Sequence, residues 1–118
     1  MAQDFERAVA ADGSGDVAIG TTARTIITAN SDDAVIGIRL ANILTQTIQA
    51  DVYITSTASG GSADSYIVKN VSIPQGSSIE LIDGGAKVVL QSGDVLKAKS
   101  DTANSLNVWV SYIDSIST

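Results

Sequence analysis

The stretch YIVKNVSIPQGSSIEL, from Tyr66 to Leu81, contains the pattern that decides the fold. A run rich in β-branched residues reaches Ile73, the turn Pro74-Gln75-Gly76 follows, and a second short apolar run comes directly after it. Proline fixes φ at the first corner of a turn, and glycine relieves the strain at its exit. The stretch therefore predicts two short strands joined by a tight turn.

Short apolar runs that end in glycine, proline, aspartate or asparagine recur along most of the chain, from Val35 to Ile113. Several of them alternate polar and apolar residues with a period of two, which indicates strands with one buried face. No stretch is long enough for the crossover helix that a parallel sheet needs. The pattern predicts an all-β fold, an antiparallel β-sandwich of jelly-roll-like form with about eight short strands. These strands are expected at residues 22–29, 34–42, 48–56, 65–73, 78–82, 87–90, 95–100 and 105–113.

The first twenty residues differ from the rest, because they are polar and small and show no sustained period. We interpret them as an extended N-terminal arm, or a loosely attached first strand, that orders mainly on contact with something else. A short helical turn over Phe5 to Ala11 is the alternative. The sequence therefore predicts an arm at residues 1–20 and a β-sandwich domain at residues 21–118.

The alternation also predicts which side chains point inward. Ile36, Ile38 and Leu40 are expected to face the core from one strand. On the next strand, Asp51 and Tyr53 are expected to face outward.

Trp109 has two possible positions, since it shares a strand face with Asn107 and Ser111 and lies opposite Val108 and Val110. A lone tryptophan in a sandwich is more often a core residue, so the core is the expected position. An exposed Trp109 would instead mark a contact site, because aromatic anchors dominate the energetics of interfaces.

The residues that carry most catalytic chemistry are missing. Histidine and cysteine are both absent, which excludes a Ser-His-Asp triad, a Cys-His pair and an ordinary zinc site. Most carboxylates lie in predicted turns, where aspartate caps the backbone. The segment from Asp12 to Asp16 imitates the start of a calcium loop, but Val17 and Ala23 replace its glycine and its bidentate glutamate. We therefore expect no enzyme activity, no catalytic residues, no cofactor and no metal.

The charge balance argues against nucleic acid as a partner, since the net charge is −6 and the seven basic residues are scattered. Lys97 and Lys99 are interpreted as solvated lysines that protect a strand. No apolar run approaches the ~18 residues of a membrane span. The N-terminus lacks the basic and apolar blocks of a signal peptide, so synthesis in a cytoplasm is expected.

Five segments resemble a group of small virion structural proteins of tailed bacteriophages, particularly those that infect cyanobacteria. They are VIGIRLAN (35–42), ADVYI (50–54), YIVKN (66–70), IPQGSS (73–78) and LQSGDVLK (90–97). The resemblance extends from Val35 to Ile113. It implies a β-sandwich without catalytic residues, made in the bacterial host cytoplasm and located in the virion, but it does not fix the position in the particle.

We accordingly expect a homo-oligomeric capsid decoration protein that docks on a major capsid, neck or tail protein through its arm and one sheet face. The residues expected at the contact are Phe5, Arg7, Tyr53, Tyr66 and Trp109. A neck, tail or fibre-attachment protein of the same virion is one alternative. A carbohydrate- or host-surface-binding module is another, using the loop from Ser56 to Ser62 together with Tyr53, Tyr66 or Trp109.

Overall fold

The computed structural model describes residues 4–10, 18–56, 63–82 and 88–114, and these contain strands but no helix. None of the described segments forms a helix that could cross a membrane. The strands are β1 (Asp4–Ala10), β2 (Arg24–Thr28), β3 (Asp33–Asn42), β4 (Ile48–Ser56), β5 (Ala63–Ile73), β6 (Ser78–Glu80), β7 (Val88–Leu90), β8 (Val95–Ser100) and β9 (Leu106–Asp114).

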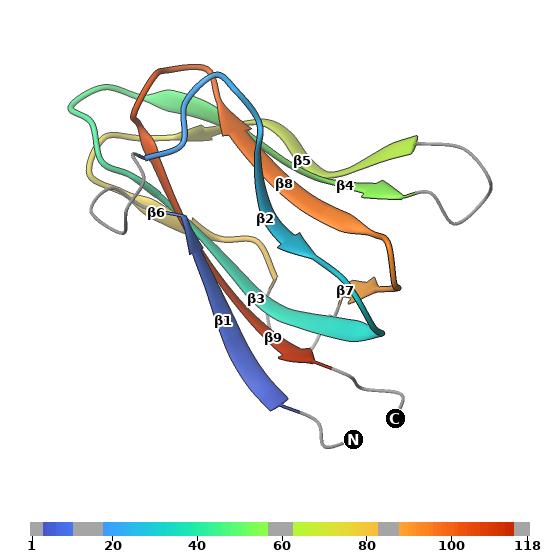
Figure 1. The fold of residues 1–118 in the computed structure, drawn as a ribbon. Helices are drawn as coiled ribbons and strands as arrows, with labels where there is room; N and C mark the ends of the chain where they lie inside the picture. Colours follow the sequence, from blue (N-terminus) through green and yellow to red (C-terminus); the bar gives the residue numbers. More distant parts are fainter. Residues whose placement is uncertain (1–3, 11–17, 57–62, 83–87, 115–118) are drawn as a thin grey trace.

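The described strands form two antiparallel sheets that face each other (Figure 1). The first sheet has the order β1-β9-β3-β6. The short strands β6 and β7 pair with opposite ends of β3. The second sheet has the order β2-β8-β4-β5. The predicted all-β, antiparallel sandwich is confirmed, and most strands fall within two residues of their predicted positions.

The core lies between the sheets and is built from the alternate residues of each strand. Fully buried side chains come from both sheets, as period-two alternation requires. They include Val35, Ile38, Leu40, Leu106, Val108 and Val110 from the first sheet and Ile48, Val52, Ile73 and Leu96 from the second.

The segment expected to be an arm contributes a regular strand. Residues 4–10 form β1, which pairs with β9 through seven consecutive residue pairs, from Asp4 opposite Asp114 to Ala10 opposite Val108. The alternative of a helical turn over Phe5 to Ala11 is therefore wrong for the described part of that segment. The chain is next described at Ala18, and Ile19 is fully buried and bridges to Leu106 of β9.

The prediction that Ile36 faces the core is wrong. The pairing of β3 with β9 shifts register between Val35 and Gly37, which is a β-bulge. The extra residue reverses the alternation beyond it, so Val35 is buried while Ile36 borders a surface depression shared with Phe5. Ile38 is buried as predicted.

Asp51 and Tyr53 alternate with the core residues of β4, but they are only 7% and 8% exposed. Their burial comes from the neighbouring strand, because Tyr66 packs on Tyr53 and Asn70 bonds to Asp51. Alternation correctly excluded both from the core and gave no sign of this second layer of contacts.

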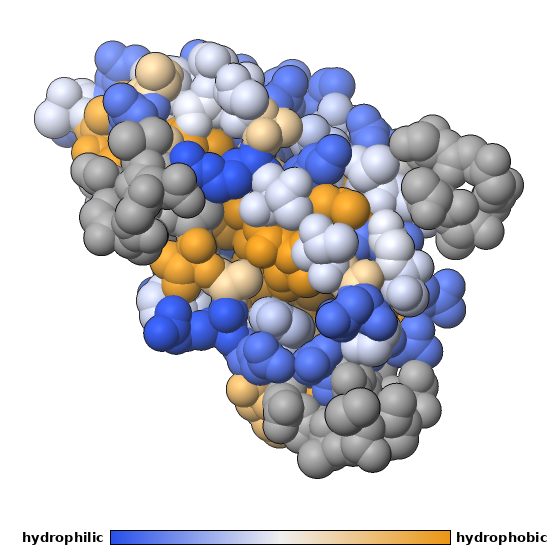
Figure 2. Space-filling view, viewed as in Figure 1, coloured by the Kyte–Doolittle hydropathy of each residue, from blue (hydrophilic) through white to orange (hydrophobic). Residues whose placement is uncertain are grey.

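Figure 2 shows the side of the molecule on which β1 and β2 form the sheet edges. Apolar residues are visible there between the two sheets, with hydrophilic residues around them. Ala8 of β1 and Ile26 of β2 pack against the core on this side and are partly buried. The sandwich is therefore less completely covered between β1 and β2 than at its centre.

Candidate functional site

Trp109 lies on the outer surface of the first sheet, and its expected position in the core is wrong. Its neighbours Val108 and Val110 point into the core, so Trp109 points the other way and remains 48% exposed. On either side it is paired with Val9 of β1 and Arg39 of β3. We call this surface the Trp109 face; its described residues are Phe5, Arg7, Val9, Ile36, Gly37, Arg39, Glu80, Trp109 and Ser111.

Charged side chains on two neighbouring strands flank the indole. The guanidinium carbon of Arg7 lies 5.2 Å from the centre of the Trp109 ring, which is a cation–π distance. On the other side, Arg39 Nε and Nη2 both donate to Glu80 Oε1 at 3.2 Å. An exposed ion pair contributes little to stability, and this one lies at one edge of the aromatic surface.

Shallow depressions surround the same ring. One of about 420 Å³ is lined by Trp109, Arg39 and Glu80. A second of about 520 Å³ is lined by Trp109, Phe5 and Arg7, and a third of about 340 Å³ by Trp109 and Val9. Phe5 is 78% exposed at the margin of this surface. The arrangement offers an aromatic and apolar centre with a rim of both charge signs, Arg7, Arg39 and Glu80, which suits protein binding.

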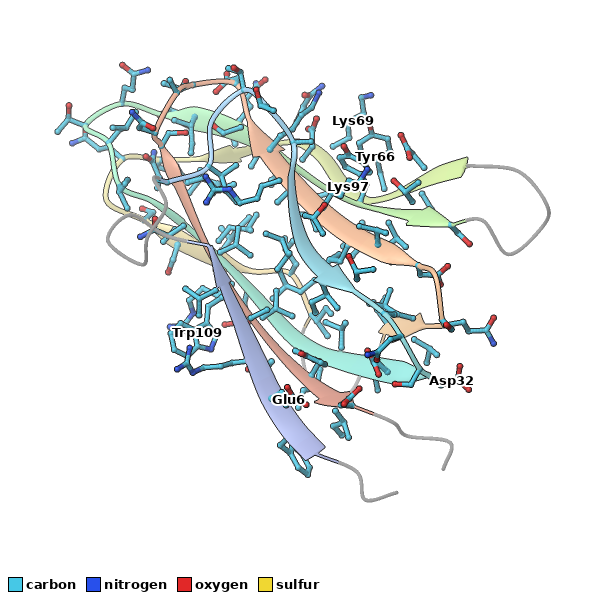
Figure 3. The ribbon with its side chains drawn as sticks, viewed as in Figure 1. Glu6, Asp32, Tyr66, Lys69, Lys97 and Trp109 are labelled. Atoms are coloured by element: carbon cyan, nitrogen blue, oxygen red, sulfur yellow. The ribbon has the colours of Figure 1, made fainter. Side chains whose placement is uncertain are left out.

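Tyr53 and Tyr66 form a second aromatic site on the outer face of the second sheet. Their ring centres are 5.0 Å apart, and Lys69 Nζ lies 4.5 Å from the centre of the Tyr66 ring. Tyr66 is 40% exposed. Burial, and next the nearby carboxylate of Asp64, raise the pKa of the Tyr53 hydroxyl above its usual value. Figure 3 shows Tyr66, Lys69 and Lys97 together, well away from Trp109.

The five residues predicted from the sequence therefore separate into two groups. Phe5 and Arg7 lie with Trp109, whereas Tyr53 and Tyr66 lie on the outer face of the other sheet. Sequence reasoning missed Arg39, Glu80 and Lys69. Their contribution depends on which strands are neighbours and on bulges, and neither is visible in a single-strand pattern.

Among the described residues, no group of three carboxylates stands close enough to hold a metal ion. The segment at residues 12–16 that imitates a calcium loop lies outside the described residues, as does most of the loop from Ser56 to Ser62.

No protein-family model matches the chain, and no curated protein matches its sequence. Among solved structures, the fold is similar to a chain in the crystal structure of the T13 viral particle of infectious bursal disease virus, with a TM-score of 0.51 and 11% identity. The match covers 98% of this chain and 36% of that one. A chain in the structure of the Gt strain of that virus matches at a TM-score of 0.41 and 10% identity, over 96% of this chain and 30% of that one.

At such low identity the likeness to the particle chain establishes a shared β-fold and nothing about activity. The present chain spans about a third of the length of the chains that it matches. The described residues thus form an all-β domain of two facing sheets with an exposed aromatic face.

Proposed function

We propose that this chain is a non-enzymatic structural component of a virion, present in symmetric copies, that docks on other virion proteins through the Trp109 face. The observation that carries the proposal is the exposed Trp109, which has Arg7 over its ring and Phe5 beside it. Burying such a group against a partner is favourable, because tryptophan and arginine are frequent anchors of protein interfaces. The similar fold in a chain of a viral particle is consistent with this role.

More specifically, the virion is that of a tailed bacteriophage, and the protein decorates its capsid in preference to a place in the neck, the tail or a fibre attachment. It follows the sequence resemblance described above. The expected division into an arm at residues 1–20 and a sandwich domain at residues 21–118 changes in one respect, because β1 is a strand of the first sheet. Since β1 supplies Phe5 and Arg7 to the Trp109 face, the arm and the sheet face together form one docking surface.

The test is incorporation of the tagged chain into particles of the virus that encodes it. Changing Trp109→Ala should weaken docking by about 2 kcal/mol or more, which is roughly thirty-fold. Tyr66→Ala is the matched control, because it removes an exposed aromatic side chain from the opposite face. Normal incorporation of the Trp109 variant, or a loss that is equal in both variants, would reject this docking surface.

A truncation tests the contribution of the arm, and its boundary matters. Removing residues 1–10 deletes β1 but keeps Ile19, which fills the core and bridges to Leu106. We expect the shortened protein to stay folded and to lose docking. Mild dissociation of purified particles then locates the protein, since release together with intact tails would overturn the preference for the capsid.

The tyrosine pair favours a second candidate function, the binding of carbohydrate on a host surface. Tyr66 is exposed and Lys69 lies above its ring, which places an exposed aromatic group beside a cation. A glycan array tests this directly. Specific binding that is lost in Tyr66→Ala and kept in Trp109→Ala would support it, and no binding to any glycan would reject it.

A further inference from the structure

The edges of the two sheets differ in their fitness to pair with another chain. Edge strands are commonly protected from such pairing by bulges, by charges or by being very short. On the second sheet, β5 has two register shifts and β2 has one between Thr25 and Ile27. On the first sheet, β6 and β7 have three residues each. Only β1, among the described edge strands, combines seven residues with an unbroken register.

Of these protections, β1 has only charges, at Asp4, Glu6 and Arg7. Phe5, Glu6 and Arg7 are exposed, while Ala8 and Val9 are half-buried. Within the described residues, β1 pairs with β9 alone; it lies close to β2 of the second sheet, but the two strands are not paired, so the other edge of β1 is unpaired (Figure 1). Backbone groups on that edge are available to a further strand.

We propose that β1 pairs in antiparallel orientation with β1 of a second copy of this chain, joining the first sheets of the two molecules about a twofold axis. The inference rests on the homo-oligomer within the proposed function and names its interface. A strand edge that meets its own copy about a twofold axis is self-complementary, as an isologous interface requires. The added strand would also extend the first sheet beside the apolar opening between β1 and β2 (Figure 2).

Symmetry limits the register of this pairing. A twofold axis perpendicular to the sheet places the outer faces of both copies on the same side. One residue of β1 then lies opposite its own copy, and the axis passes between the two. If the two copies of Arg7 lie opposite each other, all seven residues of β1 are paired. Phe5 of each copy then lies opposite Val9 of the other. Centring on Glu6 would oppose two like carboxylates, and centring on Ala8 would leave Asp4 and Phe5 unpaired.

The two Arg7 side chains meet at the axis in the favoured register, and like charges would normally oppose pairing. Each guanidinium, however, lies over the Trp109 ring of its own chain. Trp109 belongs to β9, on the side of β1 away from the free edge. The charge is thereby drawn away from the axis.

The dimer would carry two Trp109 faces on the same side of one continuous sheet. Two linked docking surfaces bind a symmetric particle more tightly than one, because the second contact forms at high effective concentration.

Cysteine cross-linking tests the register, since the chain contains no cysteine. The double variant Phe5→Cys/Val9→Cys cannot close within one strand, because four residues span about 13 Å and a disulfide bridges Cα atoms no more than about 7 Å apart. Across the dimer, opposite residues lie about 4.5–5.5 Å apart. We expect a covalent dimer on mild oxidation, and little from either single variant.

The control is Tyr66→Cys/Lys69→Cys on the bulged edge β5, which should give little dimer. Sedimentation of the unmodified full chain should show a concentration-dependent dimer, and Phe5→Lys/Val9→Lys should raise its dissociation constant at least tenfold. A monomer at every concentration, or equal cross-linking at both edges, would overturn the proposal. If the protein dimerises but does not enter particles, the virion function is rejected and the interface is not. If the protein enters particles as a monomer, the interface is rejected and the virion function is not.

Discussion

Asp51 Oδ1 accepts a hydrogen bond of 2.7 Å from the backbone N–H of Asn70. The bond joins β4 to β5 where Ala50 pairs with Val71 but Val52 pairs with Val68, so β5 has an extra residue there. Asn70 has a φ of 56°, in the left-handed region. The carboxylate thus satisfies a donor at the point where the ladder is interrupted, and it does so from a buried position.

Removing this acceptor should destabilise the protein. We expect Asp51→Ala to lower the free energy of unfolding by about 1.5–3 kcal/mol, because a hydrogen bond to a charged group is lost and a donor is left unpaired. Urea denaturation measures the change. Asp51→Asn retains an acceptor oxygen and should lose less; an equal loss in both variants would mean that charge, and not this bond, is what matters.

The backbone conformation at Asn70 gives a second prediction. A left-handed residue with a β-carbon costs about 1–2 kcal/mol, a cost that asparagine partly avoids and glycine does not bear. We expect Asn70→Gly to leave the thermal midpoint nearly unchanged and Asn70→Val to lower it clearly. If valine were tolerated as well as glycine, the bulge would not require this conformation.

The exposure of Trp109 can be measured without a partner. It is the only tryptophan in the chain, so intrinsic fluorescence reports on this one side chain. We expect acrylamide to quench the emission of the free protein efficiently and to quench it much less after docking. Arg7→Ala should alter the emission of the free protein by removing the cation from the ring; emission typical of a fully buried indole would contradict the structure.

Stability at alkaline pH should depend on Tyr53. Burial, and then Asp64, raise the pKa of its hydroxyl in the folded protein above the ordinary value of 10.0. The folded state then holds its proton more tightly than the unfolded state, so this stabilisation is complete below pH 10 and is lost as the pH rises through the folded pKa. Tyr53→Phe should show a shallower loss of stability above pH 10 in urea titrations. Tyr66→Phe should make the loss only slightly shallower, because the charge of Tyr66 is a lesser cause of the raised pKa of Tyr53; identical slopes in all three proteins would contradict the prediction.

Much of the fold could be predicted because the evidence for strands is local. Alternating residues and the Pro74-Gln75-Gly76 turn fix strand positions without knowledge of partners, and β4 and β8 match their predicted bounds. The bulge at Ile36 could not be found this way, since it depends on the register between β3 and β9. Trp109 was misplaced because alternation defines two faces but does not say which of them another sheet covers.

The candidate site was only partly predictable for the same reason. Phe5, Arg7 and Trp109 were singled out as residue types that favour contact, without any knowledge that they lie together. Their proximity comes from the pairing of β1 with β9, which joins the two ends of the chain. Arg39 and Glu80 reach the same surface through β3 and β6.

The attachment of Ala10 and Ile19 to β9 has a practical consequence. Ala10 is opposite Val108 and Ile19 is opposite Leu106, and Asn42 occupies the other side of Leu106. The intervening peptide therefore leaves one edge of β9 and rejoins that same edge two positions along. Because Ala10 and Ile19 are both held on this one edge, a change that displaces β9 near Leu106 would release the described chain on both sides of residues 11–17 at once.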